Sequence, residues 1–271
     1  MSLFDLSGKV CVVTGSTKGM GRAIVERYTE HGARVVVTSR HLNECEAVAE
    51  KLNAKRKADC AVPCAFDLSD AATTSAPIEA ALKKWGRIDV VVANAAIITM
   101  GAFDAAPDSE YELAFTGNVR NNARLTRAAL PAMRKQGNGG SIIYVLSTVG
   151  LFPSPPYLTY ALSKAALGHL TRILAVDLGP ENIRVNAIVP GMIKTFAAEA
   201  FSRNPEAVKL AIGRNPLGRM GESDEIAAPA VLLASPGGAY INGQLIIVDG
   251  GQIHQGREAA RNVAEAGLAE V

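Results

Sequence analysis

The sequence predicts an α/β fold of the doubly wound type, with a mostly parallel sheet of seven strands and helices on both of its faces. Short β-branched runs alternate with longer helical patterns, as they do where crossover helices join parallel strands. Several runs are apolar without alternation, which marks strands that are buried on both faces. The first 250 residues contain no linker, repeat or low-complexity stretch. We therefore expect a single domain over residues 1–251.

The elements follow from these runs in chain order. The expected strands are KVCVVTG (9–15), ARVVVTS (33–39), CAVPCAFD (60–67), IDVVVANA (88–95), SIIYVLS (141–147), IRVNAIVP (183–190) and QLIIVDG (244–250). Helical patterns fill the intervals at 20–31, 41–54, 71–85, 109–135, 158–178 and 223–235. The stretch GNGG is typical of a helix stop and turn, and FPSPPY of a rigid loop directly before a helix. The Ala-rich segment 252–271 is expected to be either helical or disordered.

Composition excludes several classes of protein. The chain has 271 residues, 48% of them hydrophobic, which is enough for a sizeable core without disulfides or metals. A formal net charge of +2 argues against a nucleic-acid or membrane-surface binder. The longest apolar runs have the length of strands, far below the roughly 20 residues of a membrane span. The start MSLFDLSGK lacks the features of a signal peptide.

The cysteines and histidines indicate neither a metal site nor a disulfide framework. Cys11, Cys45, Cys60 and Cys64 are unevenly spaced with no histidine pattern to complete a zinc site, and the four histidines are scattered. We expect free thiols, no bound metal and a cytoplasmic protein.

A glycine-rich segment, TGSTKGMG, follows the first strand and opens the first helix. In that context Gly15 permits a tight turn, Gly19 lets the backbone approach a pyrophosphate, and Gly21 lets the helix pack on the sheet. The helix N-terminus then offers unpaired N–H groups and a partial positive charge to phosphates. The spacing is G-x-x-x-G-x-G, and an ordinary strand–helix turn is the alternative. The pattern predicts a dinucleotide site in a Rossmann-type sheet.

The end of the second strand indicates which dinucleotide is bound. An NAD site usually has Asp or Glu about 20 residues beyond the glycines, where it holds the ribose hydroxyls. Here the residues are Thr38, Ser39 and Arg40, so no carboxylate is expected there. Arg40 and Lys18 are suited to a 2′-phosphate, which favours NADPH over NADH. The alternative is two solvated surface cations.

A second group of residues carries the predicted chemistry. Tyr160 and Lys164 are four residues apart on an expected helix, so their Cβ atoms lie roughly 5–6 Å apart on one face. Ser147 ends a buried strand, at the carboxyl edge where α/β sheets bind ligands. Asn118 lies in the preceding long helix. Alternatively, the Tyr–Lys pair is a surface pair and Ser147 a turn or cap residue.

Taken together, these motifs resemble the short-chain dehydrogenase/reductase family in its single-domain form. The resemblance covers about residues 6–251. Its carriers are TGSTKGMG, the Asp67-Leu68 pair, ANAA at 93–96, Asn118, Ser147, YALSK at 160–164, NAIVPGMIKT at 186–195 and VDGG at 248–251. Among family members, the chain is most similar to NADPH-dependent carbonyl reductases that act on ketones and aldehydes.

The resemblance implies a role for each residue of the second group. Tyr160 would be the general acid in reduction and the base in oxidation, and Ser147 would hydrogen-bond the substrate carbonyl. Lys164 would hold the nicotinamide ribose, and Asn118 would position a water that links Lys164 to solvent. A lysine charge about 5 Å away, shielded from water, is expected to lower the Tyr pKa from ~10 by about two units.

The resemblance also implies the cofactor contacts. These are Gly15, Ser16, Thr17, Lys18, Gly19, Met20, Gly21, Ser39, Arg40, Asp67, Leu68, Asn94, Ala95, Ala96, Tyr160, Lys164, Pro190, Gly191, Ile193 and Thr195. The family's usual Asn-Asn-Ala-Gly is replaced here by Ala93-Asn94-Ala95-Ala96. The hydrogen bond that the first Asn makes to the central sheet is therefore in question.

The substrate is expected to be an apolar ketone, aldehyde or alcohol. Its pocket would be walled by 97–103, 148–158 and 192–210, and the last stretch indicates an amphipathic lid. Packing of these residues against the core or another subunit is the alternative. Family members commonly form homotetramers through the helices at 109–135 and 158–178. Two other functions stay open: an NAD-dependent secondary-alcohol dehydrogenase on the same scaffold, and a non-catalytic NADPH-binding module.

Overall fold

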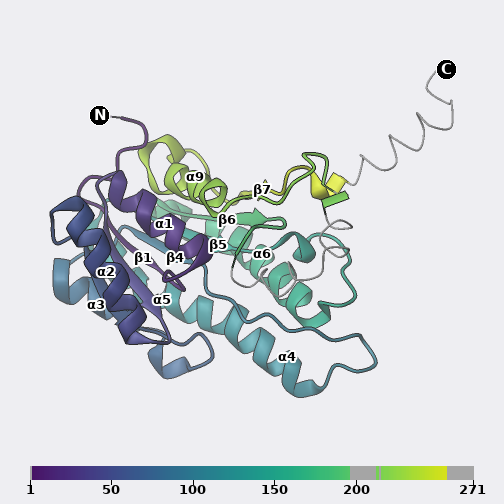
Figure 1. Cartoon of the computed structure of the whole chain (residues 1–271). Helices are drawn as coiled ribbons and strands as arrows, with labels where there is room; N and C mark the ends of the chain where they lie inside the picture. The colour runs from purple at the N-terminus through teal and green to yellow at the C-terminus, as the bar shows by residue number, and fades with distance from the viewer. Residues whose placement is uncertain (1, 196–211, 214, 255–271) are drawn as a thin grey trace, which may run out of the picture.

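Seven strands form one sheet in the computed structural model, which describes residues 2–195, 212–213 and 215–254 (Figure 1). The strands are β1 (Val10–Val13), β2 (Arg34–Ser39), β3 (Ala61–Ala65), β4 (Val90–Ala93), β5 (Gly140–Val145), β6 (Ile183–Pro190) and β7 (Leu245–Val248). Their order across the sheet is β3-β2-β1-β4-β5-β6-β7. Every neighbouring pair is parallel. The predicted doubly wound α/β fold is thus confirmed.

Helices cover both faces of this sheet. One face packs against α1 (Gly19–Glu30), α2 (Leu42–Arg56) and α9 (Ser223–Ala234). The other packs against α3 (Ala76–Trp85), α5 (Asn122–Gln136) and α6 (Leu158–Leu178). The short helix α4 (Asp108–Phe115) contacts α6 and projects at the lower edge of Figure 1. Single 3₁₀ turns occur at Ala71–Thr73, Thr148–Gly150, Gly179–Glu181, Pro236–Gly238 and Gln252–His254.

The apolar runs of the sequence are explained by this two-sided burial. In β1, Cys11 and Val13 belong to the core cluster under α1, while Val10 and Val12 belong to the cluster on the opposite face. All four side chains are fully buried. Because successive side chains point to opposite faces, a strand covered on both sides needs an apolar residue at every position.

Two expected helices differ from the prediction. The pattern at 109–135 is divided into α4, a π-helical stretch Thr116–Asn121 and α5. The pattern at 71–85 begins with the 3₁₀ turn Ala71–Thr73, and its α-helix starts at Ala76, with Pro77 in the first turn. Proline is tolerated there because the first N–H groups of a helix have no partner within the helix.

The strand order creates the crevice in which a ligand can lie. From β1 the chain adds β2 and then β3 on one side, and then crosses to β4 on the other. In sheets of this kind the carboxyl ends of the two strands that flank the reversal border the ligand site. The glycine loop after β1 and the segment from residue 94 after β4 lie at this point.

Two predictions, on the lid and on the tail, concern the ends of the described ranges. Most of the expected lid, from 196 onward, and the tail from 255 lie outside the described residues. The start of the tail, Gln252–His254, is a 3₁₀ turn.

All four cysteines carry free thiols, as predicted. None of the helices in the described ranges has the length and hydrophobicity that a bilayer span requires.

Candidate active site

The glycine loop is locked to the second strand through Thr38. Thr38 Oγ1 accepts a hydrogen bond from the Gly15 N–H (3.0 Å), and the Thr38 backbone bonds Ser16 in both directions. Ser16 Oγ also donates to the Val13 carbonyl (2.8 Å). The hydroxyl of Ser16 is therefore engaged within the protein. Its observed contacts stabilise the loop and do not reach the groove described below.

Close packing around the glycines leaves no room for side chains. Gly15 and Gly19 have φ values of +64° and +55°, in the left-handed region that favours glycine. A Cβ on Gly19 would lie 3.3 Å from Thr195 Cγ2, and a Cβ on Gly21 would lie 2.6 Å from Asn94 Nδ2. The first turn of α1 thus packs closely against Asn94 on one side and Thr195 on the other, and forms a narrow cradle. This shape fits the pyrophosphate of a dinucleotide.

A groove of about 680 Å³ runs over this cradle. Most of the predicted cofactor residues line it: Gly15, Thr17, Lys18, Gly19, Met20, Ser39, Arg40, Asp67, Leu68, Asn94, Ala95, Ala96 and Thr195. Sequence reasoning missed His41, Glu44, Phe66, Ser69 and Leu113, and it assigned Ile97 and Ile98 to the wall of the substrate pocket instead. The structure therefore gathers six separate segments of the chain along one groove.

The end of the groove next to β2 contains an acidic group that sequence reasoning missed. Glu44, in the first turn of α2, accepts hydrogen bonds from Lys18 Nζ (2.9 Å), Thr17 Oγ1 (3.2 Å) and Ser39 Oγ (3.3 Å). The expectation that no carboxylate stands near the end of β2 is therefore wrong. Glu44 comes from the helix that follows, one turn beyond the strand position where an acid is usually sought.

Two further charged residues stand close by. Arg40 is exposed at the groove, and Asp67 follows β3. Hydrogen bonds from Ser69 lower the pKa of Asp67, and the positive charge of Arg40 adds to this effect. Asp67 Oδ1 accepts from both the Ser69 N–H (2.9 Å) and the Ser69 hydroxyl (2.7 Å), so this carboxylate also shapes its own turn.

Asn94 connects the first and fourth strands under the glycine loop. Its Nδ2 donates to the carbonyls of Thr14 (2.9 Å) and Gly15 (3.1 Å), while Thr14 Oγ1 accepts from the Asn94 and Ala95 N–H groups. The contact between β1 and β4 is thus made without an Asn at position 93. Asn94 Oδ1 is buried and has no hydrogen-bond partner among the described residues. A free acceptor in the groove wall suits a ligand hydroxyl.

Ser147, Tyr160 and Lys164 come together where β5 meets α6. Tyr160 and Lys164 lie one turn apart on α6, with 9% and 1% of their surfaces exposed. Lys164 Nζ is 5.6 Å from the centre of the Tyr160 ring and donates to the Val145 carbonyl (2.7 Å). Ser147 follows β5, hydrogen-bonds Tyr160, and accepts from the Val149 N–H (3.4 Å). The pair is buried at the sheet edge and is not a surface pair.

The titration of this pair differs from expectation. Burial raises the pKa of Tyr160 to about 12, and the hydrogen bond with Ser147 offsets only part of this rise. The same burial lowers the pKa of Lys164 to about 7. The expected lowering of the Tyr160 pKa by a charged neighbour is therefore wrong here. Removing water destabilises both the phenolate and the ammonium, and near neutral pH Lys164 carries only part of its charge.

Asn118 is buried in the π-helical stretch between α4 and α5. Its Oδ1 accepts from the Ile97 N–H (2.8 Å), and its Nδ2 donates to the Ile97 carbonyl (2.8 Å) and to Ser163 Oγ (3.0 Å). Ser163 in turn donates to the Tyr160 carbonyl (2.7 Å). The Asn118 side chain thus holds the loop after β4 against α6. Its observed contacts reach the helix of Tyr160 and do not reach Lys164.

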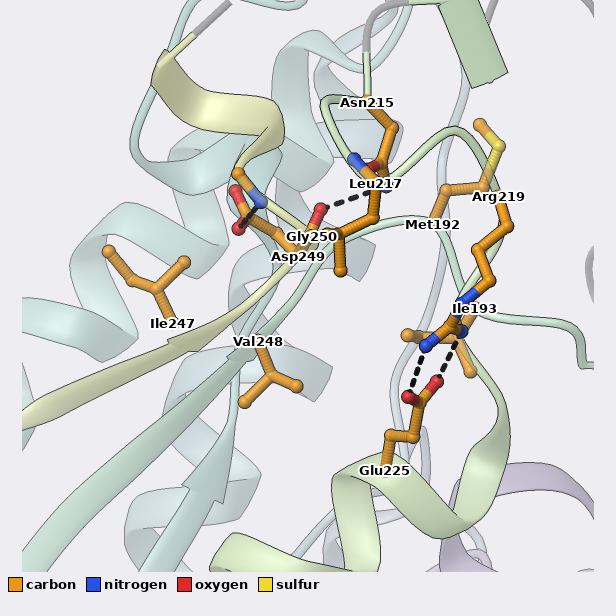
Figure 2. A pocket seen from close by; sticks show the side chains of 12 residues that line it. Met192, Ile193, Asn215, Leu217, Arg219, Glu225, Ile247, Val248, Asp249 and Gly250 are labelled. Atoms are coloured by element: carbon orange, nitrogen blue, oxygen red, sulfur yellow. Dashed lines mark hydrogen bonds and ion pairs between the residues drawn. The ribbon is translucent and has the colours of Figure 1, made fainter.

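The segment after β6 contributes residues to the walls of two separate hollows. Thr195 borders the cofactor groove, whereas Ile193 lines a second cavity of about 480 Å³ at the carboxyl ends of β6 and β7 (Figure 2). That cavity is bordered by an ion pair in which Arg219 donates to both carboxylate oxygens of Glu225 (2.7 and 2.6 Å). None of Asn118, Ser147, Tyr160 and Lys164 lines this cavity or the first groove. We place the chemistry beside the first groove because Asn118 hydrogen-bonds both Ile97, which lines that groove, and Ser163, which neighbours Lys164 on α6.

Comparison with known proteins gives consistent matches over nearly the whole chain. Residues 15–252 match the family model described as Enoyl-(Acyl carrier protein) reductase. An uncharacterized oxidoreductase of Mycobacterium tuberculosis is 38% identical over 251 residues, covering 93% of this chain and 94% of that protein. A 3-oxoacyl-(acyl-carrier-protein) reductase of Thermotoga maritima is 34% identical, with coverage of 92% and 99%.

Solved structures match the fold equally well. A gluconate 5-dehydrogenase from Burkholderia cenocepacia, in complex with NADP and tartrate, has a TM-score of 0.87 at 27% identity and covers 93% of this chain and 98% of its own. A 7α-hydroxysteroid dehydrogenase complexed with NADH and 7-oxo glycochenodeoxycholic acid has a TM-score of 0.86 at 32% identity, with coverage of 92% and 96%. Similar folds thus hold either nicotinamide cofactor.

Proposed function

The chain belongs to the short-chain dehydrogenase/reductase family of oxidoreductases, which use a nicotinamide cofactor, and from this premise we propose that it reduces ketones or aldehydes to alcohols with NADPH, reversibly. The observation that carries the proposal is that the buried side chains of Tyr160 and Lys164 lie together with the half-buried Ser147. Asn118 links the helix of Tyr160 and Lys164 to Ile97 in the wall of the dinucleotide groove. We further propose that residues 1–251 form its single catalytic domain.

Tyr160 is the proposed proton donor to the carbonyl oxygen. With a pKa of about 12 it is protonated throughout the neutral range, so it has a proton to give. Ser147 already hydrogen-bonds Tyr160, and its hydroxyl would orient the substrate oxygen and stabilise the charge that develops on it. Bound NADPH would supply the hydride. The protonated fraction of Lys164 would stabilise the phenolate left behind, because its amine lies near the ring.

Lys18 and Arg40 support the choice of NADPH. Both line the adenosine end of the groove, and guanidinium and ammonium groups are suited to a phosphate. Gly15, Gly19 and the α1 N-terminus would hold the pyrophosphate, and the orphaned Asn94 Oδ1 would accept from a ribose hydroxyl. Pro190, Gly191 and Ile193, with Lys164, remain the proposed nicotinamide contacts.

Exposed apolar side chains beside the site support an apolar substrate. Ile98, Met100 and Phe103, in the loop after β4, expose 51%, 66% and 83% of their surfaces, and Leu151 after β5 exposes 43%. Exposed groups of this kind often mark a binding surface. They favour an apolar carbonyl compound over a highly charged metabolite.

A screen of cofactor oxidation tests the proposed function. The purified protein is mixed with a panel of ketones and aldehydes, and the loss of absorbance is followed with NADPH and, in parallel, with NADH. We expect turnover of apolar carbonyls with a higher kcat/KM for NADPH. Nucleotide binding without turnover over the whole panel would indicate a non-catalytic module. A higher kcat/KM for NADH would favour the NAD-dependent alcohol dehydrogenase.

We also propose a cytoplasmic homotetramer. Leu162, Ile173 and Val176 lie on one stripe of α6 and expose 45%, 52% and 80% of their surfaces. Ile247 on the edge strand β7 exposes 40%. A second copy that covers the α6 stripe, and another that covers the β7 edge, would bury these groups. The free thiols suit a reducing compartment.

A further inference from the structure

The cofactor groove combines a carboxylate with the very donors that suit a phosphate. Glu44 Oε1 accepts from Lys18 Nζ, and Glu44 Oε2 accepts from the hydroxyls of Thr17 and Ser39. Lys18 comes from the glycine loop, Ser39 ends β2, and Glu44 begins α2. All of them line the same end of the groove. The carboxylate therefore sits between the two segments that enclose the adenosine ribose in sites of this kind.

Glu44 is ionised at neutral pH. The hydrogen bond from Lys18 is the main cause that lowers the pKa of Glu44, and the hydroxyls of Thr17 and Ser39 lower it further. The position in the first turn of α2 adds the favourable end of the helix dipole. About one third of the side chain is exposed, so the charge faces the groove as well as its partners.

A ribose 2′-phosphate would compete with this carboxylate. To reach Lys18 and Ser39, the phosphate must displace Glu44 or share its donors, and in either case two groups of like charge come close together. The Ser39 hydroxyl has a single proton, which it already divides between Glu44 and the His41 carbonyl (both 3.3 Å). A ribose that carries a 2′-hydroxyl brings no such charge. Arg40 is outside this cluster of hydrogen bonds and would remain the main attraction for a phosphate.

We propose that Glu44 is a specificity-determining residue, whose carboxylate takes up Lys18, Thr17 and Ser39 and so weakens binding of a 2′-phosphorylated adenosine nucleotide relative to one with a 2′-hydroxyl. This inference rests on the proposed dinucleotide function of the groove. It implies that the preference for NADPH is smaller than Lys18 and Arg40 alone would produce.

Calorimetric titration with two nucleotide fragments tests this without any substrate. The probes are 2′,5′-ADP and 5′-AMP, added to the wild type, to Glu44→Gln and to Glu46→Gln. Glu46 is an exposed acid on the same helix and provides a control for net charge. We expect Glu44→Gln to bind 2′,5′-ADP about tenfold more tightly, equivalent to ~1.4 kcal/mol. Its affinity for 5′-AMP should change less than twofold, and Glu46→Gln should resemble the wild type.

Two further measurements keep the test decisive. The gain in Glu44→Gln should shrink at high salt, because screening weakens the repulsion that was removed. Glu44→Ala, which cannot hydrogen-bond Lys18, should show a gain of the same sign, with the helical circular dichroism of each variant confirming its fold. Equal changes for both probes, or weaker binding of 2′,5′-ADP, would overturn the role of Glu44. Failure of the wild type to bind either probe, NADPH or NADH would instead refute the proposed function and the inference together.

Discussion

At the scale of single residues, the proposed chemistry depends on one phenol. Tyr160 is 9% exposed and hydrogen-bonds Ser147. A second phenol, Tyr157, lies at the start of the same helix, with its ring centre 6.3 Å from that of Tyr160. Phenylalanine would fill the buried volume without a proton to give. Tyr160→Phe should therefore keep its fold and its affinity for NADPH while kcat falls by about 10²–10⁴-fold. Turnover with a responsive ketone and a fluorescence titration of NADPH would measure both. The matched change Tyr157→Phe should leave kcat within a few-fold, and a Tyr160→Phe enzyme with near-normal kcat would remove Tyr160 as the acid.

The buried amine makes a prediction about stability. The pKa of Lys164 is about 7 in the folded protein against an ordinary value of 10.5, so between these values the unfolded chain binds more protons than the folded one. The free energy of unfolding should therefore rise with pH in this window, by up to about 1.4 kcal/mol per pH unit from this residue. Below pH 7 the contribution of Lys164 to the free energy of unfolding is at its lowest and no longer changes with pH.

Lys164→Met removes the titrating group and measures its contribution. The difference in unfolding free energy between wild type and variant should move in favour of the wild type as the pH increases from 7.5 to 9. Denaturant titrations of both proteins at several pH values measure this difference in unfolding free energy. The contributions of the other titrating groups, which the two proteins share, cancel in it. A difference that is constant with pH would contradict a neutralised, buried Lys164.

At the scale of elements, the contact of α1 with the sheet depends on glycine at one position. A Cβ on Gly21 would lie 2.6 Å from Asn94 Nδ2 and would also collide with the Gly15 carbonyl. Gly21→Ala should push α1 away from β1 and cost about 1–3 kcal/mol of stability, with a loss of nucleotide affinity. At Gly179, after α6, a Cβ would lie at an ordinary 3.5 Å from Asn242 Nδ2. Gly179→Ala should therefore be neutral or slightly stabilising. Thermal unfolding and NADPH titration compare the two variants, and equal tolerance would contradict the packing account.

The interrupted helix before β5 shows how an element adapts to its site. Periodicity predicts one helix over 109–135, because its apolar positions continue through the whole stretch. In the folded chain, Thr116–Asn121 adopts a π-helical turn, and a Cβ on Gly117 would collide with Ile97. Asn122 Nδ2 donates to the Asn118 carbonyl (2.8 Å) across this turn. Turns of this kind are often found at functional sites, and here the turn positions Asn118 against the loop after β4.

At the scale of the whole molecule, the exposed stripe on α6 makes a prediction about assembly. Light scattering after size-exclusion chromatography should give a mass near four times the 28.4 kDa chain. Val176→Glu places a charge in the proposed contact and should shift the mass to a smaller species. Leu42→Glu, the same kind of change on α2 at a side chain that is 46% exposed, should not. A single monomer peak for the wild type would contradict the tetramer.

Much of the fold and of the site could be predicted because it depends on local pattern. Two-sided burial forces apolar runs into every inner strand, so the seven strands and their parallel, doubly wound arrangement follow from the runs. Glycine spacing after a strand predicts the cradle, since the backbone conformation at Gly15 and Gly19 is a local requirement. The four-residue spacing of Tyr160 and Lys164 likewise predicts a shared helix face.

What the sequence alone determined, then, was the order of elements and which residues reach the sheet edge. Tertiary structure alone decided what those residues meet there. Glu44 is 26 residues from Lys18 and joins it only because α2 starts beside the glycine loop. The Asn118 side chain hydrogen-bonds Ile97 and Ser163. Burial raises the pKa of Tyr160 and lowers the pKa of Lys164. These outcomes depend on burial and charge summed over several elements, and a pattern along the chain contains no information about distances between its separate parts.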